Sequence, residues 1–136
     1  MKIEYHIEGG DFSAAGSASS EIKKILKQFN ISPFLLRRIA VALYESEMNV
    51  VAHAYRGIMR VEIQPSGIRV VVEDEGPGIE DIEKAMEEGF STATEEVRQM
   101  GFGAGMGLPN IKKNSDEMRL ISTPGIGTQL EFRVKF

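Results

Sequence analysis

The feature that most constrains the fold is a long helical pattern from Pro33 to about Tyr55. Ser32 precedes it as a cap and Pro33 stands at its first position, where both residue types are favoured. Glu45 and Asn49 are four residues apart, a spacing that puts both side chains on one helix face. Their neighbours are small and apolar: Val41, Ala42, Val50, Val51 and Ala52. The pattern predicts a largely buried helix whose covered surface is interrupted by one polar pair.

The remaining segments predict strands grouped into hairpins, with helices between the groups. We expect strands at 2–8, 59–64, 68–74, 117–122 and 128–136, with turns at Pro65–Gly67 and Pro124–Gly127. We expect further helices from Asp11 or Ser13 to Asn30, over 79–88 and over 108–114. No regular alternation of strand and helix is present. The sequence therefore predicts an α/β (α+β) two-layer sandwich, with a mixed, largely antiparallel sheet covered on one face by helices.

Composition narrows the class of protein. A length of 136 residues predicts a single domain over 1–136. The 16 Lys and Arg residues stand against 20 Asp and Glu, a net charge of −4 that disfavours nucleic acid as a partner. Cysteine is absent, which excludes disulfides and thiolate metal sites. With no apolar run of membrane-spanning length and no signal-peptide pattern, we expect no membrane association and a cytoplasmic location.

Glu45 and Asn49 suit a magnesium–nucleotide site. Mg²⁺ prefers oxygen ligands and retains waters, so one Asn carbonyl together with phosphate oxygens suffices to hold it. Glu45 could then accept a proton as a general base. The alternative is a solvated polar face, which is common for such pairs. His53 is interpreted as a structural histidine in preference to a metal ligand. Glu47 points elsewhere and is left out of the site.

Two glycine-rich segments follow this helix. Asp74 ends a predicted strand before Gly76 and Gly78, and it is either part of a simple turn or an acceptor for the exocyclic amine of adenine. Residues 101–107 have glycine at every second position and lead into a helix at Leu108, where backbone amides favour phosphate. Their spacing fits neither G-x-G-x-x-G nor G-x-x-x-x-G-K-[ST], which excludes the Rossmann and P-loop interpretations.

Taken in order, these motifs resemble those of the GHKL ATPase and kinase superfamily, which has the Bergerat fold. The motifs are Glu45-x-x-x-Asn49, Asp74-x-Gly76-x-Gly78, Gly101-x-Gly103-x-Gly105-x-Gly107 and Gly127-Thr128. Within that superfamily the chain is most similar to the stand-alone bacterial anti-sigma factor serine kinases and the stressosome switch kinases. The similar stretches are 42–49 with 53–55, 73–79, 89–92 and 105–109.

The resemblance implies ATP and Mg²⁺ as cofactors, with Glu45 as general base, Asn49 as metal ligand and Asp74 as adenine reader. It also implies that Gly76, Gly78 and Thr128 line the adenine pocket, and that Gly103, Gly105, Gly107 and Leu108 hold phosphate at the hinge of a mobile lid. Arg98 in that lid is either a γ-phosphate contact or a solvated charge.

Two functions follow from the resemblance. The first is a serine/threonine kinase that phosphorylates an anti-sigma-antagonist (STAS) domain. The second is a nucleotide-gated module that sequesters a sigma factor or another regulator with little catalysis. A homodimer is left open by either function.

Overall fold

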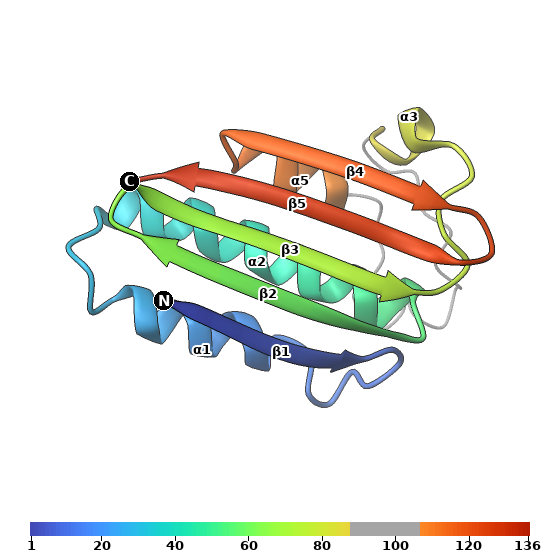
Figure 1. The fold of residues 1–136 in the computed structure, drawn as a ribbon, viewed down its shortest axis with the longest axis horizontal. Coiled ribbons are helices and arrows are strands. Elements are labelled where there is room, and N and C mark those ends of the chain that lie inside the picture. Colours follow the sequence, from blue (N-terminus) through green and yellow to red (C-terminus); the bar gives the residue numbers. More distant parts are fainter. Residues whose placement is uncertain (88–106) are drawn as a thin grey trace.

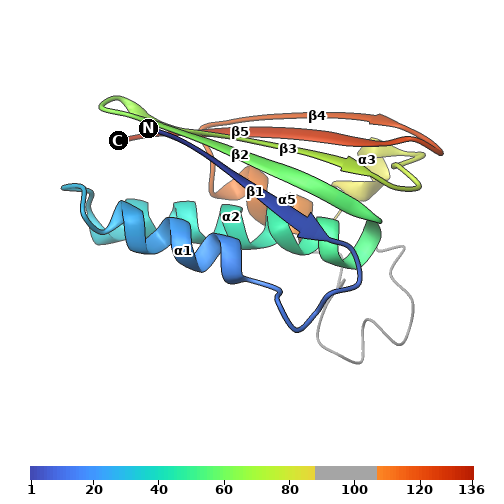
Figure 2. The ribbon, with the colours of Figure 1, turned by 60° about the horizontal axis from the view of Figure 1, so that its bottom comes forward.

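The protein, described here by a computed structural model over residues 1–87 and 107–136, has one sheet and one layer of helices. The strands are β1 (Lys2–Glu8), β2 (Arg56–Gln64), β3 (Gly67–Glu75), β4 (Glu117–Thr123) and β5 (Gly127–Lys135). The helices are α1 (Ser17–Leu26), α2 (Pro33–His53), α3 (Ile82–Ala85) and α5 (Gly107–Lys113). The strand order is β1-β2-β3-β5-β4. Figures 1 and 2 show α1, α2 and α5 against one face of this sheet, so the predicted two-layer architecture is confirmed.

Every neighbouring pair of described strands is antiparallel, so the sheet is less mixed than the sequence analysis predicted. The hairpin between β2 and β3 pairs Gln64 with Gly67, which leaves two residues in the turn. The hairpin between β4 and β5 pairs Thr123 with Gly127. Short turns of this kind connect only antiparallel strands, which explains why the two predicted hairpins dominate the sheet.

Helix α2 lies at the centre of the helical layer, in contact with α1, α5 and the sheet. Ser32 Oγ accepts a hydrogen bond from Leu35 N at 3.2 Å, so the predicted cap is confirmed. Ile39, Leu43 and Val50 have no exposed surface and pack against inward-facing strand residues such as Phe132. No helix in residues 1–87 or 107–136 is long and apolar enough to cross a membrane.

The opposite face of the sheet is charged. Arg60 lies between Glu4 and Glu73, with N–O distances of 3.8 and 3.4 Å. Glu131 pairs with Arg69, and its carboxylate lies 3.6 Å from Arg133. Exposed pairs of this kind add little stability, but they keep this face hydrated. The apolar core therefore lies between the sheet and the helices.

Helix α1 begins later than the sequence predicted, at Ser17 instead of Asp11 or Ser13, and it ends at Leu26 instead of Asn30. Gly16, just before it, has φ of +90°, a conformation that ends any helical run from the preceding residues. The first amide groups of α1 are capped from another helix. The carboxylate of Glu47 accepts hydrogen bonds from Gly16 N at 3.0 Å and from Ser19 N at 2.9 Å. This cap is formed by tertiary contact and has no local sequence pattern.

Helix α3 is also shorter than predicted, because its start is delayed to Ile82. Gly78 has φ of +72°, and Ile79 N donates to Ser122 Oγ at 2.7 Å, so the chain turns here instead of coiling. Asp81 then caps the helix by accepting a hydrogen bond from Lys84 N at 3.1 Å. The predicted end of this helix, at residue 88, lies outside the described residues.

Candidate functional site

Glu45 and Asn49 converge on the first residue of α5, as their spacing predicts. A Cβ atom built on Gly107 would lie 3.1 Å from Asn49 Oδ1 and 3.2 Å from Glu45 Oε2. These distances are tight for a methyl group, so a side chain at position 107 would press on both polar groups. Glycine here lets the backbone of α5 approach the carboxylate and the carboxamide together. The structure therefore brings three of the predicted site residues to one point.

Glu45 is half-buried, and its carboxylate has a partner that the sequence analysis missed. The side chain of Asn110, one turn after Gly107 on α5, hydrogen-bonds to it. Burial raises the pKa of Glu45 above its ordinary value, and the hydrogen bond from Asn110 opposes part of that rise. A carboxylate with a raised pKa is a better proton acceptor than one in water. The chemistry available at this point is therefore general-base catalysis.

A second group of predicted residues lies at the end of β3. Asp74 Oδ1 accepts a hydrogen bond from Thr128 N on the neighbouring strand β5, at 3.0 Å. Burial raises the pKa of Asp74, and the hydrogen bond from Thr128 acts in the opposite direction. Oδ2 has no hydrogen bond to any residue within 1–87 or 107–136, which makes it available to a ligand donor such as an exocyclic amine.

The alternation of three neighbouring strands explains why polar groups gather here. Asp74 follows the inward-facing residues Val70 and Val72, and Thr128 precedes the inward-facing Leu130 and Phe132 on β5. Ser122 occupies the equivalent end of β4, and its Oγ lies 2.9 Å from Thr128 Oγ1. These three residues thus form a polar end to the apolar layer. Ser122 was not among the predicted residues, although strand alternation could have identified it.

Gly76 and Gly78 follow Asp74, as the motif requires, and the structure gives each a packing reason. A Cβ on Gly76 would lie 3.0 Å from Ala54 Cα, at the end of α2. A Cβ on Gly78 would lie 2.5 Å from Thr123 O, at the end of β4. Tyr55 N also donates to Glu75 O at 2.8 Å, which ties the end of α2 to the end of β3. Helix α2 therefore connects the Glu45 group to the Asp74 group.

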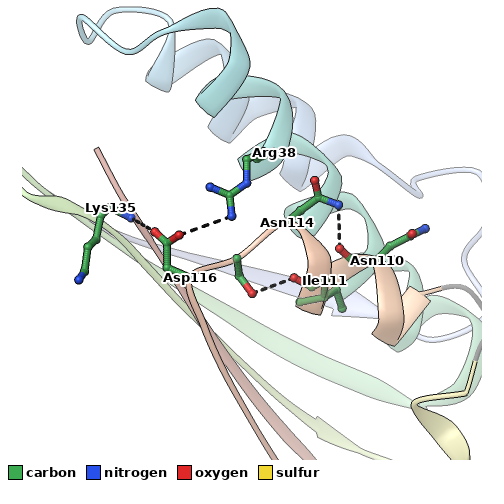
Figure 3. Close-up of polar contacts among 7 residues, drawn as sticks. Arg38, Asn110, Ile111, Asn114, Asp116 and Lys135 are labelled. Carbon is green, nitrogen blue, oxygen red and sulfur yellow. Dashed lines mark hydrogen bonds and ion pairs between the residues drawn. The ribbon is translucent and has the colours of Figure 1, made fainter.

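The far end of α5 is fixed by polar contacts, shown in Figure 3. Asp116, just after this helix, accepts hydrogen bonds from Lys135 N at 2.7 Å and from Arg38 Nη2 at 3.5 Å. Asn114 Nδ2 donates to Asn110 O at 2.8 Å, and Ser115 Oγ donates to Ile111 O at 2.8 Å. Leu108 is buried beneath α5, so only its backbone remains for the predicted phosphate contact. These contacts fix the position of α5 relative to α2 and β5.

The donor set was tested against a magnesium ion. Residues 1–87 and 107–136 contain no group of three or more His, Asp or Glu side chains that could hold a metal. Asn49 Oδ1 is a hard oxygen ligand beside Glu45, which fits an ion held mainly by phosphate oxygens and water. Burial lowers the pKa of His53, which agrees with a neutral structural histidine.

Part of the predicted site lies outside the described residues. Gly101, Gly103 and Gly105 belong to the predicted phosphate-binding segment, and Arg98 to the predicted lid. Glu47 lies within the described part but was left out of the site, and the structure places it at the start of α1. The predicted residues that the structure does describe thus fall into two groups, one around Glu45 and one around Asp74.

Comparison with known proteins agrees with the motifs. Residues 11–134 match the histidine kinase-like ATPase domain. The chain is 34% identical over 113 residues to the serine/threonine-protein kinase RsbT of Bacillus subtilis (strain 168), covering 80% of this chain and 79% of that protein. It is 42% identical over 95 residues to an anti-sigma F factor of Thermoanaerobacter sp. (strain X514), covering 66% of this chain and 63% of that protein.

A further relative is similar over almost its whole length. The anti-sigma F factor of Clostridium novyi (strain NT) is 28% identical over 141 residues, which cover 99% of this chain and 93% of that protein. The resemblance inferred from the four motifs is therefore confirmed.

Proposed function

This chain belongs to the histidine kinase-like ATPase family, and from that premise we propose that it is a serine/threonine protein kinase. Its substrates would be Mg-ATP and a small regulatory protein. The observation that carries the proposal is the half-buried Glu45, whose pKa is raised by burial and which lies beside Asn49 and Gly107. A purely structural carboxylate has no need of a glycine that brings a second backbone close to it. The arrangement supports proton transfer next to a bound nucleotide.

Nucleotide binding is assigned to the Asp74 group. Asp74 Oδ2 would accept a hydrogen bond from the exocyclic amine of adenine, while Oδ1 is held by Thr128 N. Gly76, Gly78 and Thr128 would line the base, and backbone amides from Gly103 to Leu108 would contact phosphates. Because the amine of adenine is replaced by a carbonyl in guanine, an acceptor at this point selects ATP over GTP.

Asn49 would hold the metal through its carbonyl oxygen. When bound, Mg²⁺ supplies charge neutralisation for the phosphates. Asn49→Ala is therefore expected to weaken binding of ATP in Mg²⁺ by about 1–3 kcal/mol, since one oxygen ligand is lost. Calorimetry in Mg²⁺ and in EDTA provides the measurement, and an equal loss in both buffers would contradict the metal assignment.

The chemical step assigns one role to Glu45. Its carboxylate accepts the proton of a serine or threonine hydroxyl on the partner, and the hydroxyl oxygen forms a bond to the γ-phosphorus. The bond from that phosphorus to the bridging oxygen of ATP breaks, and ADP leaves with the electron pair. The products are a phosphorylated partner, ADP and a protonated Glu45, which releases its proton to solvent.

The names of the relatives support two kinds of partner. RsbT is named a serine/threonine-protein kinase, which favours the phosphorylation of a STAS-like antagonist protein. The anti-sigma F factors favour a second function, in which the chain sequesters a sigma factor when nucleotide is bound. Both functions use the same nucleotide site, so they differ only in whether phosphate is transferred. Either function would also accommodate a homodimer.

The test is phosphotransfer with γ-labelled ATP. The purified protein is incubated with Mg-ATP and with proteins that co-purify with it from its own cells. We expect label on a serine or threonine of one of these proteins, and no label when the enzyme carries Glu45→Gln. Tight ATP binding with an unlabelled, stably bound partner would instead support sequestration.

A further inference from the structure

Two groups from α5 reach Glu45, and only one of them is a side chain. Gly107 brings backbone close to Oε2, and the Asn110 carboxamide hydrogen-bonds to the carboxylate. We propose that Asn110 is a positioning residue, which holds the Glu45 carboxylate in the orientation needed to accept a proton. This inference rests on the proposed kinase function and extends it to a residue outside the four motifs.

The chemistry of the pair suits this role. A carboxylate is purely an acceptor, and the Nδ2 group of asparagine is purely a donor, so the contact has one polarity. A single donor fixes one carboxylate oxygen and leaves the other for the attacking hydroxyl. Glu45 faces Asn49 on its own helix and Gly107 and Asn110 on α5, none of which is charged. Among the described residues, Asn110 is thus the one side chain that can orient Glu45 without neutralising it.

The position of Asn110 is itself fixed, which a positioning residue requires. Its backbone carbonyl accepts a hydrogen bond from Asn114 Nδ2 at 2.8 Å. The helix is held from behind by Asp116, which accepts from Arg38 on α2 and from Lys135 N on β5 (Figure 3). Arg38 and Glu45 belong to the same helix, so α2 and α5 are connected at both ends of the contact. Asn110 therefore meets Glu45 in a defined geometry.

The first experiment compares three variants in the phosphotransfer assay. Asn110→Asp keeps the shape and removes the donor, Asn110→Ala removes both, and Asn114→Ala is the matched control one turn later on the same helix. We expect kcat to fall about tenfold in both Asn110 variants, the usual effect of one hydrogen bond to a charged group. KM for Mg-ATP should stay within about twofold, and Asn114→Ala should retain kcat. An Asn110→Asp enzyme with wild-type kcat overturns the inference.

A double-mutant cycle tests whether Asn110 acts through Glu45. In the Glu45→Gln background, Asn110→Ala should have no further effect on kcat, because the group that it orients is already lost. A tenfold fall in that background as well would assign Asn110 another role and would contradict the proposal.

The last readout does not depend on catalysis. The side-chain amide resonances of Asn110 are identified as those absent from Asn110→Ala, and they should move in Glu45→Gln while those of Asn114 stay in place. Resonances of Asn110 that do not move overturn the inference. If they move but the wild-type protein phosphorylates no partner, the proposed function fails while the contact stands.

Discussion

Two carboxylates on α2, only two residues apart, have opposite surroundings. Glu47 is 2% exposed and accepts hydrogen bonds from three backbone amides at the start of α1, and from Ser19 Oγ at 2.7 Å. Glu45 is half-buried, with Asn110 as its side-chain donor and Gly107 against its Oε2. The backbone amides fix Glu47 as part of the fold. The open side of Glu45 leaves an oxygen for another molecule.

The difference shows what separates a structural carboxylate from a candidate catalytic one. A buried carboxylate needs several donors to compensate for lost water, and Glu47 has them. Glu45 has lost part of its water without full compensation, so burial raises its pKa. Incomplete compensation of this kind is typical of residues that act on a substrate. The predictions below exchange or remove one of the two groups at a time.

The largest expected effect is on catalysis. Glu45→Gln should lower phosphotransfer by about 10²–10⁴-fold, because the amide keeps the shape but accepts no proton. ATP affinity should remain unchanged, since Asn49 and Asp74 are intact. Glu47→Gln is the matched control and should retain most of the rate under conditions where it is folded. Equal losses in the two variants would remove the functional distinction between them.

The next effect is on stability and should fall on the other residue. Glu47→Ala leaves the buried amides of Gly16 and Ser19 without an acceptor, so we expect a loss of about 3 kcal/mol in the free energy of unfolding. Chemical denaturation of the wild type and the variant provides the measurement. Glu45→Ala should cost less than about 1 kcal/mol, because its side chain is half exposed. A smaller loss for Glu47→Ala than for Glu45→Ala would reverse the comparison.

Asp74 resembles Glu45 more than Glu47, because one of its oxygens is bound and the other is open. Asp74→Asn should weaken ATP binding by about 1–3 kcal/mol, since an amide presents a donor or a poorer acceptor to the adenine amine. Calorimetry with ATP and GTP checks this. Equal ATP affinity in the two proteins, or GTP bound as tightly as ATP by the wild type, would contradict the adenine assignment.

The sequence predicted the elements that depend on local pattern. The cap at Ser32, both hairpins and the convergence of Glu45 with Asn49 follow from side-chain chemistry and periodicity, and the structure has all of them. Two kinds of feature were missed. The start of α1 depends on Glu47, about 30 residues later in the chain, and the Asn110 contact depends on how α5 packs on α2. Contacts made through tertiary packing leave no local pattern to read.

The smallest expected effect is a pH-dependent gain in stability. Because burial raises the pKa of Glu45 in the folded protein, the stabilising contribution of its protonated form is present below the ordinary carboxyl pKa of about 4.3 and is lost as pH rises through the folded pKa. Glu45→Gln removes the charge, so its stability relative to wild type should increase with pH over that window. At pH 7 we expect a gain below about 1 kcal/mol, since water screens a half-exposed group. Glu47→Gln should be less stable than wild type at the same pH. Thermal unfolding of the three proteins at pH 4 and pH 7 checks both, and a Glu45→Gln protein that becomes relatively less stable at pH 7 would mean that Glu45, like Glu47, is held by the fold.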